Sequence, residues 1–117
     1  MVDDNADSVE MLAAFLKACG ARVLVARSAA GALAHVDAAP RLDAMVTDLA
    51  MPQMDGVELV RKVRARPDRT GLPVIALTGH YDDYAGANGF GAFLRKPVDL
   101  EQLCSAITDL VRRRASK

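Results

Sequence analysis

The chain has 117 residues, 51% of them hydrophobic and 26% charged, which suffices to bury one core without disulfides or a structural metal. Its 15 basic and 15 acidic residues cancel, so we expect no nucleic-acid binding by this domain, because such a surface needs a basic excess. No apolar run approaches the ~18 residues that span a bilayer and no signal-peptide pattern occurs, so we expect no membrane contact by this domain and a cytoplasmic location.

Helical and strand patterns alternate in the first half of the chain. A helix is predicted over residues 8–19, with Gly20 as its end, and a strand over 22–26 follows. Ser28 is suited to cap a second helix that reaches about Ala38, and a strand over 43–47 then runs directly into Asp48. The predicted apolar stripe of the first helix consists of Val9, Leu12, Leu16 and Cys19, widened by Met11 and Phe15.

The second half continues this alternation. A helix is predicted over 57–66, with valines at 57, 60 and 63 on one side and Pro67 at its end. Residues 73–77 form the most hydrophobic strand, 79–91 lack a regular pattern, and 92–94 have the pattern of a last strand. Asp99 begins the final helix as its N-cap, with Gln102 placed as in a capping box. The predicted buried stripe of that helix consists of Leu100, Leu103, Ile107 and Leu110.

This order of elements predicts the fold class. Strands separated by helices pair in parallel through right-handed crossovers, which gives an open α/β sheet. Apolar strands between amphipathic helices indicate a three-layer sandwich. No repeat, low-complexity run or linker interrupts the pattern, so we predict a single domain over residues 1–117.

The cysteines and histidines do not have the spacing of a metal site. Cys19 and Cys104 lie in amphipathic helical stretches, and we interpret them as reduced, buried small hydrophobes rather than a disulfide or ligand pair. Neither His35 nor His80 has a second histidine at ligand spacing. His35 is interpreted as a helix-surface residue, whereas His80 is placed to rim any site near Thr78.

Five polar residues follow the predicted strands at the points where those strands end. Asp3 and Asp4 follow the first strand, Asp48 the third, Thr78 the fourth and Lys96 the fifth. Because the carboxyl ends of parallel strands meet at one edge of a sheet, we expect these side chains to gather there. The segment Asp4-Asn5-Ala6-Asp7 could instead simply cap the following helix, but capping would not explain the doubled aspartate.

Three converging carboxylates repel one another unless a proton or a cation relieves the repulsion. A site of oxygen ligands that is open to solvent suits Mg²⁺ better than zinc, which prefers histidine and cysteine. A carboxylate beside Mg²⁺ and a lysine is also a competent nucleophile toward a phosphoryl group. Lys96 would neutralise the phosphoryl oxygens, and the Thr78 hydroxyl would donate a hydrogen bond to one of them.

Four strings in this order resemble the receiver domains of two-component response regulators. They are Val2-Asp3-Asp4-Asn5, Thr47-Asp48-Leu49-Ala50-Met51-Pro52 with Met54-Asp55-Gly56, Ala76-Leu77-Thr78-Gly79, and Lys96-Pro97. Asp4 precedes Asp48 by 44 residues and Asp48 precedes Thr78 by 30, as in that family. The resemblance implies a flavodoxin-like, doubly wound parallel sheet of five strands in the order 2-1-3-4-5.

The resemblance also implies a role for each site residue. Asp48 would be the phosphorylated residue, and Asp4 and Asp48 direct ligands of Mg²⁺. Asp3 would act partly through water, and the backbone carbonyl of Ala50 would complete the protein's share of the metal shell. Thr78 would be the switch hydroxyl and Phe93 the second switch residue. Lys96 would hold the phosphoryl group, next to a bond to Pro97 that is often cis. Met51-Pro52 and Asp55-Gly56 are interpreted as loop geometry rather than chemistry.

The partners implied are a histidine kinase or phosphotransfer domain as donor and a downstream effector or output domain. A homodimer is a further interaction compatible with the resemblance. No independent enzyme activity is expected beyond magnesium-dependent autophosphorylation and dephosphorylation. Two motifs are similar to those of receivers fused to hybrid histidine kinases, namely Thr78-Gly79-His80 and Lys96-Pro97-Val98-Asp99. One interpretation is therefore that this chain is a fragment of such a kinase.

Two other functions remain open from the residues alone. An aspartyl-phosphate phosphatase usually carries a second acid two residues after the nucleophile, where this chain has Ala50. A non-phosphorylated interaction module is disfavoured by the intact acidic trio. A flavodoxin-type binder is disfavoured because no glycine-rich or Ser/Thr-rich loop follows the first strand.

The sequence departs from the family pattern in two places. Only Met1-Val2 precede the acidic pair, where a strand of about five residues is usual, so we expect residues to be missing upstream. Thr78 to Lys96 spans 18 residues, which is about four fewer than the family norm, or about one helical turn. A short or distorted helix is therefore predicted near 80–88, with high mobility over 79–91.

Overall fold

The computed structural model describes residues 1–49, 54–79 and 90–115. In chain order, its elements are α1 (Ala6–Ala18), α2 (Ala29–Ala38), β1 (Met45–Asp48), α3 (Gly56–Arg64), the 3₁₀ helix η1 (Pro67–Arg69), β2 (Val74–Thr78), β3 (Ala92–Arg95) and α4 (Leu100–Ala115).

The sheet is parallel and is built around β2. The strands β1, β2 and β3 are neighbours in that order. Val2 extends the sheet beyond β1, because single parallel bridges join it to Thr47 on one side and to Ala26 on the other. From edge to edge, the chain therefore contributes the segment at Ala26, then Val2, then β1, β2 and β3. This is the predicted order 2-1-3-4-5, and the α/β fold class is confirmed.

The prediction of a strand over residues 22–26 is wrong in the length of that strand. Only Ala26 forms a bridge, and the side chains of Leu24 and Val25 are 46% and 42% exposed. Two backbone hydrogen bonds join this run to Met1: the Met1 amine donates to the Leu24 carbonyl at 2.9 Å, and the Ala26 amide donates to the Met1 carbonyl at 3.0 Å. These contacts and the single bridge at Ala26 do not form a ladder over residues 22–25.

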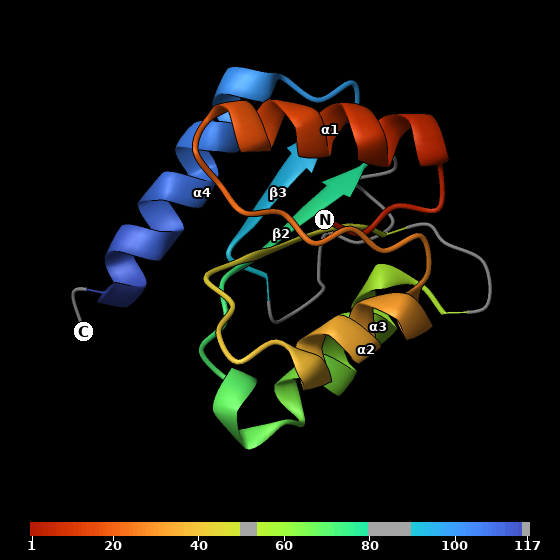
Figure 1. The fold of residues 1–117 in the computed structure, drawn as a ribbon, viewed down its shortest axis with the longest axis vertical. Coiled ribbons are helices and arrows are strands. Elements are labelled where there is room, and N and C mark those ends of the chain that lie inside the picture. Colours follow the sequence, from red (N-terminus) through yellow and green to blue (C-terminus); the bar gives the residue numbers. More distant parts are fainter. Residues whose placement is uncertain (50–53, 80–89, 116–117) are drawn as a thin grey trace.

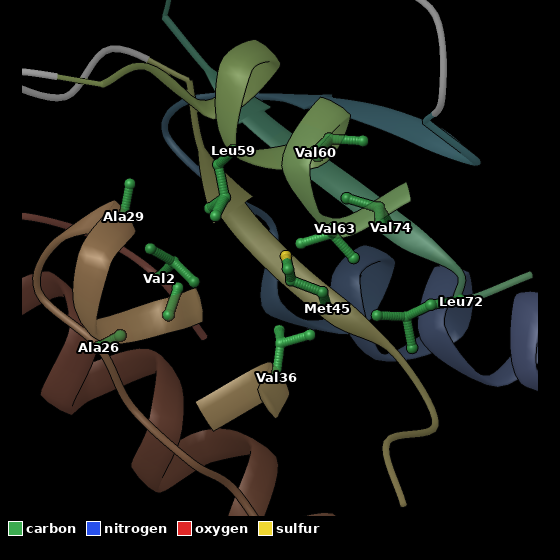
Figure 2. Packing of buried hydrophobic residues seen from close by; sticks show 11 residues of the cluster. Val2, Ala26, Ala29, Val36, Met45, Leu59, Val60, Val63, Leu72 and Val74 are labelled. Carbon is green, nitrogen blue, oxygen red and sulfur yellow. The ribbon is translucent and has the colours of Figure 1, made fainter. Parts of the chain in front are cut away.

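Helices cover both faces of the sheet, which confirms the three-layer arrangement. Figure 1 shows α1 and α4 on one side of the strands, with α2 and α3 on the other. Figure 2 shows the packing beneath α2 and α3, where Val36 and Val63 meet Met45 and Val74 of the strands. The opposite face holds a second cluster, in which α1 and α4 pack on the strands through Leu12, Leu16, Val46, Ile75, Leu77, Leu94 and Leu103.

The predicted helix caps are confirmed. Ser28 accepts a hydrogen bond from the Gly31 amide at 3.0 Å, and α2 ends at Ala38. Asp99 accepts from the Gln102 amide at 3.1 Å and so begins α4. These side chains satisfy amides that have no partner inside their helix, so the caps set the helix starts independently of distant contacts.

The buried stripes differ from their predictions in several residues. In α1, Val9, Leu12 and Leu16 are buried, but Met11 is 58% exposed, because a residue two positions from Val9 faces the other side of a helix. Cys19 is exposed because it lies at the C-cap, beyond the packed turns. Leu100, Ile107 and Leu110 of α4 are only half-buried. His35, interpreted as a helix-surface residue, is half-buried, and its Nε2 hydrogen-bonds the Val25 carbonyl at 3.0 Å.

The short helix predicted near 80–88, and the mobility predicted for most of 79–91, lie outside the described residues. Within the described ranges, no helix has both the length and the hydrophobicity that crossing a bilayer requires.

Candidate functional site

The ends of the strands bring the predicted site residues to one edge of the sheet. Asp48 is the last residue of β1 and Thr78 the last of β2. The ladder continues past β3, because the Lys96 amide donates to the Thr78 carbonyl at 2.9 Å. On the other side, the Asp48 amide donates to the Val2 carbonyl at 2.9 Å, which places Asp3 beside it. Backbone hydrogen bonds therefore hold all of these positions in register.

Three carboxylates meet at this edge. One oxygen from each of Asp3, Asp4 and Asp48 lies within 4.8 Å of the others. Asp3 and Asp48 are buried, with 1% and 6% of their surface exposed, whereas Asp4 is exposed. The group is therefore a cluster of hard oxygen donors that is open to solvent on the side of Asp4.

Lys96 supplies the positive charge in this cluster. Its Nζ lies 3.1 Å from Oδ2 of Asp48 and 3.9 Å from Oδ2 of Asp3, and its side chain is 37% exposed. The peptide bond from Lys96 to Pro97 is cis, as the family resemblance implied. Among the described residues, one ammonium thus faces three carboxylates, which leaves two negative charges uncompensated when all three are ionised.

The surroundings of Asp3 disfavour its charged form. Burial raises its pKa above the ordinary 3.8, and the charges of Asp48 and Asp4 act in the same direction. The Asn5 amide, which donates to its Oδ1 at 2.9 Å, and the Lys96 ammonium lower the pKa and offset part of the effect. Its Oδ2 is buried and accepts no hydrogen bond from the described residues. A cation at this oxygen would satisfy it.

Capping explains only part of this acidic segment. The N-cap of α1 is Asn5, whose side-chain oxygen accepts a hydrogen bond from the Ser8 amide at 2.9 Å. Asp3 and Asp4 precede that cap and belong to the carboxylate cluster instead. The helix start is therefore satisfied without either of them.

Gly56 is a positioning residue that the sequence analysis did not assign to the site. A Cβ added to Gly56 would stand 2.5 Å from the carbonyl oxygen of Asp48 and 2.7 Å from Cδ2 of Leu49. Its amide donates to the Leu49 carbonyl at 2.8 Å, and Asp55 before it caps α3 through the Glu58 amide at 2.9 Å. The pair Asp55-Gly56 thus serves geometry, as predicted, and that geometry supports the backbone of Asp48. In the sequence, the feature that could have indicated this role of Gly56 is a glycine placed directly after the N-cap residue of a helix.

The remaining predicted residues are distributed as follows. Thr78 is buried with 2% of its surface exposed. Phe93 lies on β3, is half-buried, and has its ring centroid 5.1 Å from that of Phe90. Ala50 and His80 lie outside the described residues.

Comparison with known proteins agrees with this arrangement. The sequence model of the family described as response regulator receiver domain matches residues 1–108. An uncharacterized 14.6 kDa protein in the sodA1 3′ region of Leptolyngbya boryana is 42% identical over 104 residues, which cover 85% of this chain and 78% of that protein. Probable histidine kinase 6 of Oryza sativa is 31% identical over 134 residues, which cover 95% of this chain but 14% of that protein. The chain also spans only 26% to 50% of several transcriptional regulatory proteins that it matches.

A solved structure extends the agreement to three dimensions. The response regulator receiver domain protein from Clostridium thermocellum superposes with a TM-score of 0.87 at 27% identity, covering 97% of this chain and 93% of that one. The match of the family sequence model, the parallel sheet with its segments, numbered along the chain, in the order 2-1-3-4-5, and the acidic edge all indicate the same family. The chain belongs to the response regulator receiver domain family.

Proposed function

We propose that this domain accepts a phosphoryl group on Asp48 in two-component signalling, with Mg²⁺ as cofactor. The observation that carries the proposal is the distance of 3.1 Å between Lys96 Nζ and Oδ2 of Asp48, within a cluster that also holds Asp3 and Asp4. A carboxylate nucleophile, an adjacent cation and an acidic cluster suited to a metal are the parts that phosphoryl transfer requires, since it depends mainly on positioning and charge neutralisation.

The donor atoms fit Mg²⁺. They are carboxylate oxygens within 4.8 Å of one another, and Oδ2 of Asp3 is a buried acceptor that receives no hydrogen bond from the described residues. Asp4 and Asp48 would hold the ion directly, Asp3 partly through water, and the Ala50 carbonyl would add a further ligand. When bound, Mg²⁺ neutralises charge on the phosphoryl oxygens and on the carboxylates.

In the proposed step, an oxygen of Asp48 attacks the phosphorus of a phosphohistidine. The new P–O bond forms as the P–N bond breaks, and the electron pair of that bond returns to the imidazole nitrogen. Lys96, already beside Asp48, moves its ammonium onto a phosphoryl oxygen and so retains an ionic partner. The Thr78 hydroxyl donates a hydrogen bond to another phosphoryl oxygen, which its position at the end of β2 supports.

The conformational response is assigned to Thr78 and Phe93. Thr78 is buried at the site edge, and Phe93 lies on the neighbouring strand β3, half-buried, in contact with Phe90. Attraction of the Thr78 hydroxyl toward a phosphoryl group vacates space in the sheet layer, and Phe93 moves inward to fill it. Phe93 has no hydroxyl, so its two positions differ in packing rather than in hydrogen bonding.

We assign the donor to a histidine kinase or a phosphotransfer domain, and the receiver of the signal to an effector or output domain. We place the reaction in the cytoplasm, where the ATP that charges such a kinase is found. We also propose that residues 1–117 act as one receiver domain, which is supported by two hydrophobic clusters packing on the two faces of one sheet.

The test is phosphorylation by acetyl phosphate with magnesium, followed by intact-protein mass spectrometry and peptide mapping. The expected result is one phosphoryl group on Asp48, lost on removal of magnesium and absent from Asp48→Asn. Asp43→Asn is the matched control, because Asp43 is exposed and pairs only with the exposed Arg41 among the described residues. Equal labelling of the wild type and Asp48→Asn would overturn the assignment.

A further inference from the structure

The end of α1 and the beginning of α4 bring the two cysteines of this chain together. Cys19 is the C-cap of α1, and Cys104 is the fifth residue of α4. The two helices cover the same face of the sheet, and the end of α1 lies beside the first turns of α4 (Figure 1). Both thiols are free, Cys19 is exposed and Cys104 is half-buried.

Hydrophobic packing fixes this approach independently of the thiols. Leu16 of α1 is buried in the same cluster as Leu103, and Leu100 and Ile107 pack against that cluster. Cys104 follows Leu100 by four residues and precedes Ile107 by three, so its side chain lies on the same side of α4 as theirs. Cys19 follows Leu16 by three residues and continues the packed side of α1 past its last turn. The contact between the helices therefore brings the end of α1, which carries Cys19, close to the turn of α4 that carries Cys104.

The direction of the Cys19 pKa shift agrees with this proximity to Cys104. Hydrogen bonding to the side chain of Cys104 raises the pKa of Cys19 above its ordinary value, and the charge of Cys104 acts in the same direction. The exposure of Cys19 also leaves one sulfur open to a reagent from solvent.

We propose that Cys19 and Cys104 form a reversible intramolecular disulfide when the protein meets a small-molecule disulfide such as oxidised glutathione. This inference does not depend on the proposed phosphorylation of Asp48. It also revises the interpretation of the cysteines as reduced, buried small hydrophobes rather than a disulfide pair. The cross-link ties α1 to α4 on one face of the sheet.

The reaction balances as two thiol–disulfide exchanges. The Cys19 thiolate attacks one sulfur of oxidised glutathione, forming a mixed disulfide and releasing one glutathione thiolate, which takes up a proton. The Cys104 thiolate then attacks Sγ of Cys19, forming the protein disulfide and releasing the second glutathione. The protein loses two electrons and two protons, and oxidised glutathione gains both. Because the pKa of Cys19 is raised, the first exchange becomes faster as the pH rises above neutrality.

The experiment treats the purified chain with oxidised glutathione, blocks remaining thiols with iodoacetamide, and measures intact mass and tryptic peptides. The expected product is a monomer that has lost both alkylatable thiols and yields one peptide pair linked through Cys19 and Cys104. Dithiothreitol should restore both thiols. The cross-link closes a long loop, so the melting temperature of the oxidised protein is expected to rise by at least about 5 °C.

Cys19→Ser and Cys104→Ser are matched variants, and each should keep a single thiol that ends as a glutathione adduct. Circular dichroism of the reduced variants checks that they fold, and peptide mapping of the wild type stands without them. Separate glutathione adducts on both cysteines of the wild type would overturn the proposal. So would disulfide-linked dimers, or two thiols that stay alkylatable after prolonged treatment at pH 8 to 9.

Discussion

Gly56, the first residue of α3, lies directly against the backbone carbonyl of Asp48. The contact leaves no space for even a methyl group, since an added Cβ would stand 2.5 Å from that oxygen. The position of the proposed phosphoacceptor is thus coupled to the start of a helix on one face of the sheet. This coupling depends on glycine because of close approach and not because of an unusual backbone angle.

Gly56→Ala should therefore be destabilising. Inserting a methyl group between two backbones forces α3 away from the end of β1, and the expected loss in free energy of unfolding is about 1–3 kcal/mol. Urea denaturation measures this loss. Gly71→Ala is the matched control, because a Cβ there meets nothing within 4 Å, and its effect should be neutral or slightly stabilising. Equal effects from the two substitutions would contradict the packing argument.

Magnesium should stabilise the folded chain, because the carboxylate cluster exists only when the strand ends meet. An ion at about 100 times its dissociation constant adds about 2.7 kcal/mol to the free energy of unfolding. Thermal unfolding in magnesium chloride, against sodium chloride at equal ionic strength, measures the increase. Asp4→Asn should remove most of it with little cost to the magnesium-free fold, because Asp4 is exposed. Asp43→Asn should retain it, and a melting temperature indifferent to magnesium in the wild type would count against the site.

Lys96→Met should separate phosphoryl transfer from metal binding. Lys96 sits 3.1 Å from Asp48, so its loss removes a cation that the developing phosphoryl charge needs but that also competes with a metal for the carboxylates. We expect the rate of phosphorylation by acetyl phosphate to fall by about 100-fold, while the affinity for Mg²⁺ is unchanged or higher. Stopped-flow and calorimetric titration measure the two quantities. A parallel loss of both would instead indicate general damage to the site.

The ion pair between Asp37 and Arg66 should make stability depend on pH. The Arg66 guanidinium donates to both carboxylate oxygens of Asp37, and this lowers the pKa of Asp37 below its ordinary 3.8. Because the folded-state pKa is the lower one, the pair contributes stability above about pH 4 and loses it as the pH falls through the folded pKa. Asp37→Asn should therefore be less stable than the wild type at pH 7 and equal to it in strong acid.

The Asp37→Asn comparison requires chemical denaturation across pH. Asp43→Asn again serves as the control, because its pair with Arg41 is exposed on both sides and joins residues only two apart. A stability difference for Asp37→Asn that stays constant from neutral to strongly acidic pH would show that the substitution acts through something other than this charge.

Many features of the fold and of the candidate site could be predicted from the sequence alone. The strand over 43–47, the caps at Ser28 and Asp99, and the meeting of the acidic residues with Lys96 were all predictable, because each depends on a few neighbouring residues or on a general rule of parallel sheets. The order of the four strings was also sufficient to predict the family.

Tertiary structure decided the rest, through contacts between residues far apart in the chain. The run at 22–26 has the local character of a strand, yet only Ala26 bridges, because a strand forms only where a neighbouring segment pairs with it. Gly56 became a site residue only when α3 met the end of β1. Cys19 and Cys104 lie beside each other because α1 and α4 share one hydrophobic cluster. Local patterns specify which elements form, but packing determines which of their side chains meet.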